Sequence, residues 1–177
     1  MLAASSIRLA EVIAALSLAT DLGLGQQSGF ALRSCILGVR LAEALGYSDE
    51  GIREVYYQSL LRYIGCNVDT LIFAAVVGDE FALRHDFSLV DNGNTQEIVD
   101  LFVRYIRQVN AGAEPPELTS FIASGLATLP QITASFVGHC EVAQRLATRL
   151  GFNANVVYAL GQLYERWDGR GCRAAKR

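Results

Sequence analysis

Few side chains in this sequence could bind a metal, and they lie far apart along the chain. There are 2 histidines, His85 and His139, and His85 is followed directly by Asp86. Two further acidic residues, Glu165 and Asp168, lie near the C-terminal end of the sequence. Neutral imidazoles and carboxylates bind divalent metals such as iron or manganese, and a bound metal lowers the pKa of a coordinated water so that it can attack a phosphate ester. Metal-dependent hydrolysis is therefore the first chemistry to consider.

Each of these residues also has a purely structural interpretation. His85-Asp86 follows a charged segment and has no apolar setting around it, so we interpret it as solvated surface and only a weak metal candidate. His139 can begin a helix and make a local hydrogen bond. Asp168 followed by Gly169 is typical of a turn. We expect Trp167 to anchor packing rather than to stack on a nucleotide.

Three segments, in order, resemble the HD-GYP phosphohydrolase family. Residues 29–46 are similar to the first helix of an HD domain, which carries a histidine near its start. The segment Leu60-Leu-Arg-Tyr-Ile-Gly-Cys66 resembles the motif L-L-H-D-I-G-K. Residues 138–151 resemble a helix that begins with histidine. Leu163-Tyr-Glu-Arg-Trp-Asp-Gly-Arg-Gly171 then resembles H-H-E-x-x-D-G-x-G-Y-P, which is the most specific of these matches.

Most of the metal ligands of that family are replaced in this chain. Of the five histidines that the motifs imply, only His139 is present. The other implied ligand positions, including the aspartate of the His-Asp pair, are occupied by Phe30, Arg62, Tyr63, Leu163 and Tyr164. The motif residues that remain are His139, Glu165, Asp168, Gly169 and Gly171. Arg62 places a positive charge where the family holds a cluster of metal cations. We therefore assign no catalytic residue and expect no bound metal.

The resemblance implies a helical domain that has lost its catalysis. We expect a non-catalytic HD-GYP-like domain with a regulatory or protein-interaction role, or a remnant with little function. One alternative is an active, iron- or manganese-dependent phosphohydrolase that cleaves cyclic di-GMP, as the family does, with ligands from His85, Asp86, His139 and the C-terminal carboxylates. The other is a sensor that binds a nucleotide without cleaving it, with Arg62 as the phosphate partner.

The resemblance also suggests how the chain is divided. Residues 1–28 are predicted to form an N-terminal helix and linker, and residues 29–177 a degenerate HD-GYP-like domain. Family members continue past the GYP motif, so we expect this domain to be incomplete at its C-terminus, as a frameshift or early stop would produce. Surface left uncovered there would favour self-association.

Composition limits the classes of partner. The chain of 177 residues has a net charge of −3 and is 51% hydrophobic, so it can bury a core and offers no strong positive field for nucleic acid. Its 4 cysteines form no C-x-x-C pair, which favours a reduced, cytoplasmic protein. We expect no membrane association, because polar residues interrupt the apolar stretch 118–138. The arginines at 33, 40, 53 and 62 are interpreted mainly as a solvated face.

Apolar residues recur at helical spacing, which predicts an all-α bundle of HD-domain type with about seven to nine helices. We expect a first helix from Ser5 or Ser6 to about Ala19, a second that ends at Gly46, and a third from Ser48 to Gly65. Further helices are expected over 68–77 and from a cap at Asn94 or Thr95 through Ile106. Others are expected from Pro116 to a break at Pro130 in a buried stretch, from Val137 or His139 to Leu150, and from 156 to about Trp167.

Overall fold

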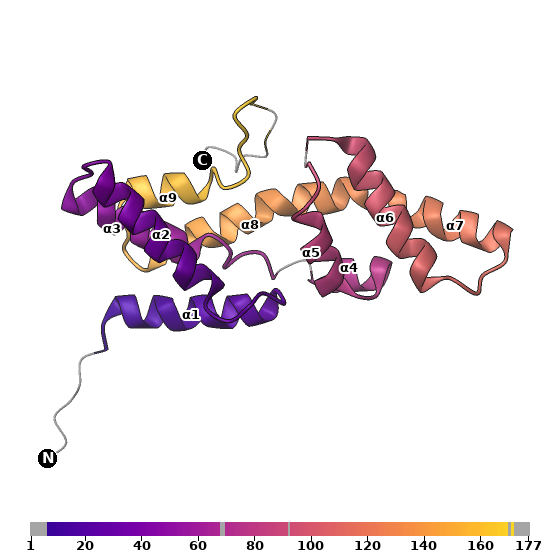
Figure 1. Cartoon of the computed structure of the whole chain (residues 1–177), viewed down its shortest axis with the longest axis horizontal. Helices are drawn as coiled ribbons and strands as arrows, with labels where there is room; N and C mark the ends of the chain where they lie inside the picture. The colour runs from indigo at the N-terminus through magenta and orange to yellow at the C-terminus, as the bar shows by residue number, and fades with distance from the viewer. Residues whose placement is uncertain (1–6, 68–69, 92, 170, 172–177) are drawn as a thin grey trace, which may run out of the picture.

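The fold is all-α, as the spacing of apolar residues predicts. The computed structural model describes residues 7–67, 70–91, 93–169 and 171. Its helices are α1 (Leu9–Gly23), α2 (Phe30–Ala44), α3 (Asp49–Leu61), α4 (Thr70–Val77), α5 (Glu80–Phe87), α6 (Thr95–Val109), α7 (Pro115–Leu126), α8 (Leu129–Arg149) and α9 (Ala154–Leu160) (Figure 1). No strand occurs within these described ranges. An all-α fold of about seven to nine helices is thus confirmed.

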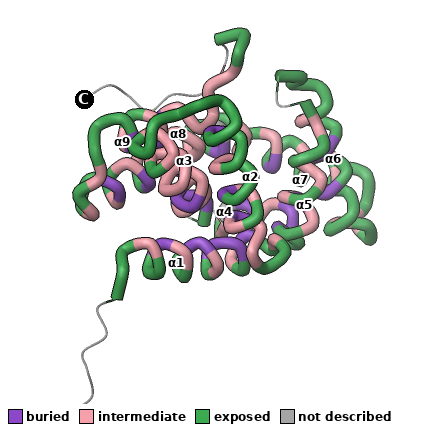
Figure 2. The backbone as a smooth tube through the Cα atoms, turned by 60° about the vertical axis from the view of Figure 1, so that its left-hand side comes forward, coloured by how far each residue is buried: buried purple, intermediate pink, exposed green. Residues whose placement is uncertain are grey.

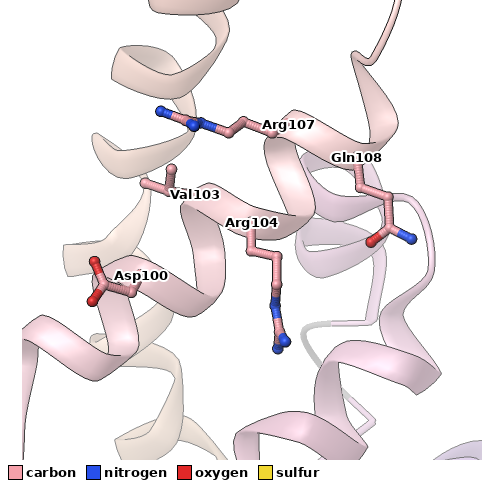
Figure 3. Close-up of a pocket in the computed structure, with 5 residues that line it drawn as sticks. All are labelled: Asp100, Val103, Arg104, Arg107 and Gln108. Atoms are coloured by element: carbon pink, nitrogen blue, oxygen red, sulfur yellow. The ribbon is translucent and has the colours of Figure 1, made fainter.

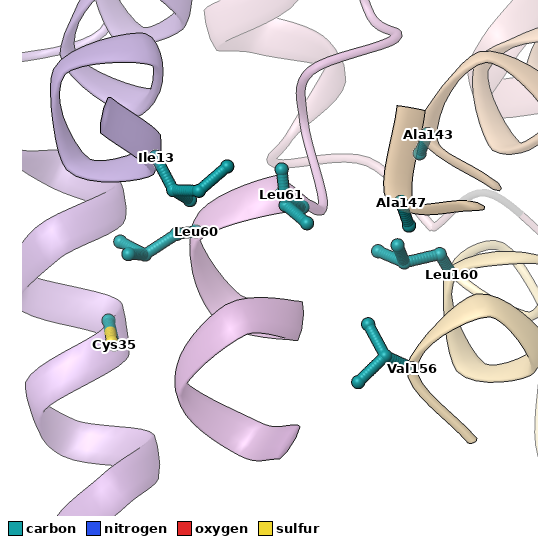
Figure 4. Packing of buried hydrophobic residues seen from close by; sticks show 8 residues of the cluster. All are labelled: Ile13, Cys35, Leu60, Leu61, Ala143, Ala147, Val156 and Leu160. Carbon is teal, nitrogen blue, oxygen red and sulfur yellow. The ribbon is translucent and has the colours of Figure 1, made fainter. Parts of the chain in front are cut away.

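Two hydrophobic cores are joined by the long helix α8, which in Figure 1 runs across the middle of the molecule from the side of α9 toward α6 and α7. The first core lies between α1, α2, α3, α9 and the C-terminal half of α8, and contains Ile13, Cys35, Leu60, Leu61, Ala143, Ala147, Val156 and Leu160 (Figure 4). The second lies between α4, α5, α6 and the N-terminal half of α8, and contains Phe73, Val77, Leu83, Leu101, Phe102, Tyr105 and Ile132. The region of α8 around His139 lies between these two cores.

Several helix ends follow directly from the local sequence. The Ser48 hydroxyl accepts a hydrogen bond from the Gly51 amide at the start of α3, and the Asn94 and Asn153 side chains cap α6 and α9 in the same way. Gly46 and Gly151 adopt positive φ angles of 72° and 76° just after α2 and α8. Glycine has no Cβ and adopts positive φ without a steric clash, which explains why these helices stop there.

Other predicted helix ends are wrong. The first helix begins at Leu9, after Arg8 as N-cap, and continues to Gly23; Ser5 and Ser6 lie outside the described residues. Pro115, rather than Pro116, begins α7. The third helix ends at Leu61 instead of Gly65, and residues 62–67 form turns. Local propensity would have continued this helix, but these turns pack against α8.

The last helix ends at Leu160 and not near Trp167. The Gln144 side-chain amide of α8 donates to the Val157 carbonyl over 2.9 Å, and a Cβ at Gly161 would collide with that same side chain. The close approach of α8 therefore stops α9 there. Trp167, predicted as a packing anchor, is fully exposed.

The segment around Pro130 also differs from the prediction. A single helix runs from Leu129 to Arg149, with Pro130 in its first turn, so the predicted separate helix starting at Val137 or His139 does not exist. The stretch 118–138 is not a buried helix either, because α7 packs mainly on α6 and buries only Gly125. Helix α5, which Asp79 caps, was not predicted, because its eight residues carry too few apolar positions to show a period.

One stretch, Pro115–Arg149, is long and apolar enough to cross a membrane by length and composition, with a mean hydropathy of 1.3 in its best window. Only 12% of that window is buried. Core helices of soluble proteins and signal sequences meet the same criteria. We therefore assign no membrane-spanning role to this stretch.

Candidate functional site

The Tyr164 hydroxyl lies at the centre of the candidate site. His139 Nδ1 and Cys66 Sγ are each 3.1 Å from it, so three residues from separate segments share one hydrogen-bonded group. His139 and Cys66 are 2% and 5% exposed, and the Phe136 ring packs against both His139 and Tyr164, with ring centroids 5.6 and 5.1 Å apart. The interpretation of His139 as a helix-start residue is therefore wrong, because it is a buried side chain in the middle of α8.

The pKa of the Tyr164 hydroxyl is raised well above its usual value. Burial is the main cause, since it disfavours a charged phenolate. The neighbouring groups Cys66, Cys140 and Tyr63 raise it further, because each would be negative when ionised. Tyr164 is thus a neutral hydrogen-bonding group at physiological pH, unlike a metal ligand.

We expect the free energy of unfolding to fall as the pH rises above about 10, in part through Tyr164. Below that pH the hydroxyl keeps its proton in both states. Above it the unfolded chain ionises while the folded chain keeps the proton, so stability is lost with rising pH. Urea unfolding at several pH values checks this: Tyr164→Phe should lose less stability than the wild type between about pH 9 and pH 11. Equal alkaline slopes for the two proteins would contradict it.

Arg62 lies in a second, adjoining cluster. Its guanidinium carbon is 4.4 Å from the centre of the Tyr63 ring and 5.8 Å from that of Phe30, which are cation–π distances. Its Nη2 donates to the Ser34 hydroxyl over 3.2 Å, and its Nε is buried without a hydrogen bond among the described residues. The guanidinium therefore lies beside aromatic rings and forms no ion pair with a described carboxylate. The interpretation of Arg62 as part of a solvated face is wrong.

The turn at residues 62–66 connects the two clusters. Tyr63 belongs to the Arg62 cluster and also acts on the pKa of Tyr164, and its carbonyl accepts the Cys66 amide over 2.9 Å. Gly65 makes the approach to α8 close, because a Cβ there would collide with the His139 carbonyl. The positions that the motifs assign to metal ligands are thus brought to one region by contacts between α2, the turn after α3, α8 and the C-terminal segment.

In the C-terminal segment, the replaced position Leu163 and the retained motif residues make several local contacts. Leu163 packs against the first core. The Glu165 carboxylate accepts the Arg166 amide over 3.0 Å, and the Asp168 carboxylate accepts from the Arg166 guanidinium over 3.3 Å. Gly169 has a φ of 73°, and a Cβ at Gly171 would collide with the Tyr164 carbonyl, so both glycines permit a tight turn.

His85 and Asp86 lie on α5, which packs against α4 and α6. The ring of Phe87, also on α5, lies 6.2 Å from that of Phe136 on α8. His85 is exposed, as the surface interpretation predicts. Asp86 accepts hydrogen bonds from the Arg104 guanidinium over 2.7 Å and from the Tyr105 hydroxyl over 3.1 Å. The carboxylate is therefore already used to hold α5 against α6.

The residues at the candidate site do not suit a binuclear metal centre. Within the described part of the chain, no group of three or more His, Cys, Asp or Glu side chains could hold a metal ion. A phenol with a raised pKa, a leucine and a phenylalanine are not ligands for iron or manganese, and the Arg62 cation would repel either metal.

A shallow concavity lies elsewhere, on the open face of α6. It has a volume of about 650 Å³ and is lined by Asp100, Val103, Arg104, Arg107 and Gln108 (Figure 3). All of these residues come from one helix, and none matches a motif position. We therefore assign it no role in the site.

Three contacts of the site were missed from the sequence. Cys66 was quoted only as the last residue of a motif, and Phe136 and Arg166 were not singled out. Phe136, His139 and Cys140 share one face of α8, since residues three and four apart are neighbours on a helix, and this spacing was the signal available for Phe136. Nothing in the sequence indicated that Arg166 also reaches Asp91, 3.3 Å away in the loop before α6.

Comparison of the chain with protein-family models, with curated proteins and with solved structures gave no match. The resemblance to the HD-GYP family therefore rests on the quoted motifs alone.

Proposed function

We propose that this chain is a non-catalytic HD-GYP-like domain that acts through protein contacts. One observation supports this most strongly. Phe30, Arg62, Tyr63, His139 and Tyr164 come from four separate segments, occupy the motif positions for metal ligands, and lie in two adjoining clusters. Such clustering is what an inherited ligand arrangement would give.

The chemistry of the clusters supports loss of hydrolysis. A neutral phenol, a thiol and one imidazole fill the first cluster, and a cation stacked on two aromatic rings fills the second. Among the described residues, no group of three or more His, Cys, Asp or Glu side chains could hold the metal that lowers the pKa of a water molecule. We further propose that the domain is cytoplasmic and that its partner is a protein, rather than a membrane or a nucleic acid.

Metal analysis with a hydrolysis assay tests the proposal. After incubation with manganese or iron and removal of unbound ions, we expect well below one metal per chain and no cleavage of cyclic di-GMP above the buffer rate. His139→Ala and the matched variant His85→Ala should leave both readings unchanged. Stoichiometric metal that disappears only in His139→Ala, together with cleavage, would instead establish the active phosphohydrolase.

A nucleotide sensor is the second candidate, and Arg62 is the observation that favours it. An arginine with no carboxylate partner among the described residues could donate hydrogen bonds to a phosphate. Calorimetric titration of the same preparation with cyclic di-GMP distinguishes it. Heat of binding that Arg62→Ala abolishes would favour the sensor, whereas no heat, or heat that Arg62→Ala leaves intact, would exclude this role of Arg62.

A further inference from the structure

A groove lies between α3 and the turn that joins α8 to α9, and it contains none of the residues of the Tyr164 and Arg62 clusters. Its volume is about 260 Å³. The four residues that α3 contributes are three, four and seven positions apart, so they share one face of that helix. Figure 2 shows α3 and the turn before α9 as mostly exposed or half-buried, so the groove opens to solvent. Its polar and aromatic lining comes from Glu50, Arg53, Glu54 and Tyr57 of α3 and from Phe152 and Asn153 of the turn.

The carboxylate of Glu54 is held in one orientation by two amide side chains. Asn153 Nδ2 and Asn155 Nδ2 donate to its Oε1 over 2.6 and 2.9 Å. The side-chain oxygen of Asn153 in turn accepts the Val156 amide at the start of α9. The other carboxylate oxygen, Oε2, makes no hydrogen bond to another described residue. Glu54 is therefore oriented before a ligand binds, and one of its oxygens remains to accept a hydrogen bond from that ligand.

The charged groups that line the groove do not neutralise one another. Glu50, Arg53 and Glu54 are neighbours on α3, yet none of them forms an ion pair with a described residue. The lining therefore offers two negative charges and one positive charge. A ligand of complementary charge carries two cationic groups and one carboxylate, and charge-assisted hydrogen bonds of this kind are the strong ones.

Two aromatic rings form the apolar part of the groove. The ring centroids of Tyr57 and Phe152 are 4.5 Å apart, and the ring planes are inclined by 52°. Aliphatic chains pack on such rings, and the ring faces attract an ammonium group. The volume is just below the ~300–1,000 Å³ typical of pockets for drug-sized ligands, so the groove suits one small molecule and is too small for a dinucleotide.

We propose that this groove binds a free basic amino acid of the lysine type. Its two ammonium groups pair with the carboxylates of Glu50 and Glu54, its carboxylate pairs with the Arg53 guanidinium, and its aliphatic chain packs on Tyr57 and Phe152. Each charged group of the lining then has a partner of opposite sign. The site depends neither on the HD-GYP resemblance nor on the proposed role in protein contacts, because it uses no motif position.

Titration of the ¹⁵N-labelled full chain with L-lysine, followed by nuclear magnetic resonance, tests the proposal. We expect saturable shifts confined to the groove, with a dissociation constant below about 10 mM. Norleucine, which lacks the side-chain ammonium, and cadaverine, which lacks the carboxylate, should each bind at least about fivefold more weakly. N-acetyl-lysine methylamide keeps only the side-chain cation and should be weaker still.

Single variants assign each charge of the ligand to its partner. Glu54→Gln, whose side-chain carbonyl can still accept the two amides, should weaken lysine at least about fivefold, and Glu50→Gln serves as a second variant if the first does not fold. Arg53→Gln should weaken lysine and leave cadaverine unchanged. Glu117→Gln is the matched control: Glu117 is an exposed carboxylate on α7, and this variant should bind lysine like the wild type.

Several results would overturn the proposal. These are the absence of a saturable shift with lysine, equal binding of lysine by Glu54→Gln or Glu50→Gln and the wild type, and binding of norleucine and cadaverine as tight as that of lysine. Binding of N-acetyl-lysine methylamide as tight as that of lysine would assign the groove to a lysine side chain of a polypeptide and would likewise overturn it.

Discussion

Replacement of Tyr164 by alanine is expected to lower the free energy of unfolding by about 2–4 kcal/mol. The ring fills the space beside Phe136 and His139, and its hydroxyl is the shared hydrogen-bond partner of His139 Nδ1 and Cys66 Sγ. Alanine removes the ring contacts and leaves both polar groups without this partner. Urea unfolding followed by circular dichroism gives the change in free energy directly.

Two further variants separate the contributions of the ring and the hydroxyl. Tyr164→Phe keeps the ring and should cost about 1–2 kcal/mol, since only the two hydrogen bonds are lost. Tyr158→Ala is the matched control: Tyr158 on α9 is 58% exposed, and its removal should change stability by less than about 0.5 kcal/mol. If Tyr164→Ala is no more destabilising than Tyr158→Ala, the C-terminal segment does not contribute to the core as described.

Replacement of Gly65 by alanine is expected to cost about 3 kcal/mol, at the upper end of what overpacking costs. The added Cβ would meet the carbonyl and Cα of His139, which are backbone atoms of α8 and cannot rotate away as a side chain would. The turn at residues 62–66 would have to move, and both Arg62 and Cys66 would move with it. Thermal and urea unfolding measure the loss.

Gly138→Ala provides a control of opposite sign. Gly138 is adjacent to His139 inside α8, and a Cβ there would meet nothing within 4 Å. Alanine in the interior of a helix is favoured over glycine by about 0.5–1 kcal/mol, so this variant should be more stable than the wild type. A stabilising Gly65→Ala would show that the turn does not approach α8 as closely as described.

The fold class and many helix ends were predictable because they depend on local physical chemistry. Apolar spacing depends on 3.6 residues per turn, and Ser48, Asn94 and Asn153 cap helices through their own side chains. The ends at Leu61 and Leu160 were not predictable. Near both ends the chain contacts α8, at His139 after α3 and at Gln144 after α9. The local sequence contains no signal for a contact with a helix so distant along the chain.

The candidate site was predictable in its composition and not in its contacts. The replacement of expected ligands by Phe30, Arg62, Leu163 and Tyr164 can be seen in the sequence itself. That Tyr164 joins His139 to Cys66, and that Arg62 stacks on aromatic rings, depends on distances between segments up to 98 residues apart.

The sequence by itself therefore determined an all-α chain whose motif positions lack most metal-binding side chains, because helical period and side-chain type belong to each residue. Only the tertiary structure decided what replaces the metal ligands, and which large apolar residues remain outside. Both depend on how α8 lies across two cores and on which face α2 turns inward, and packing over the whole chain determines these orientations.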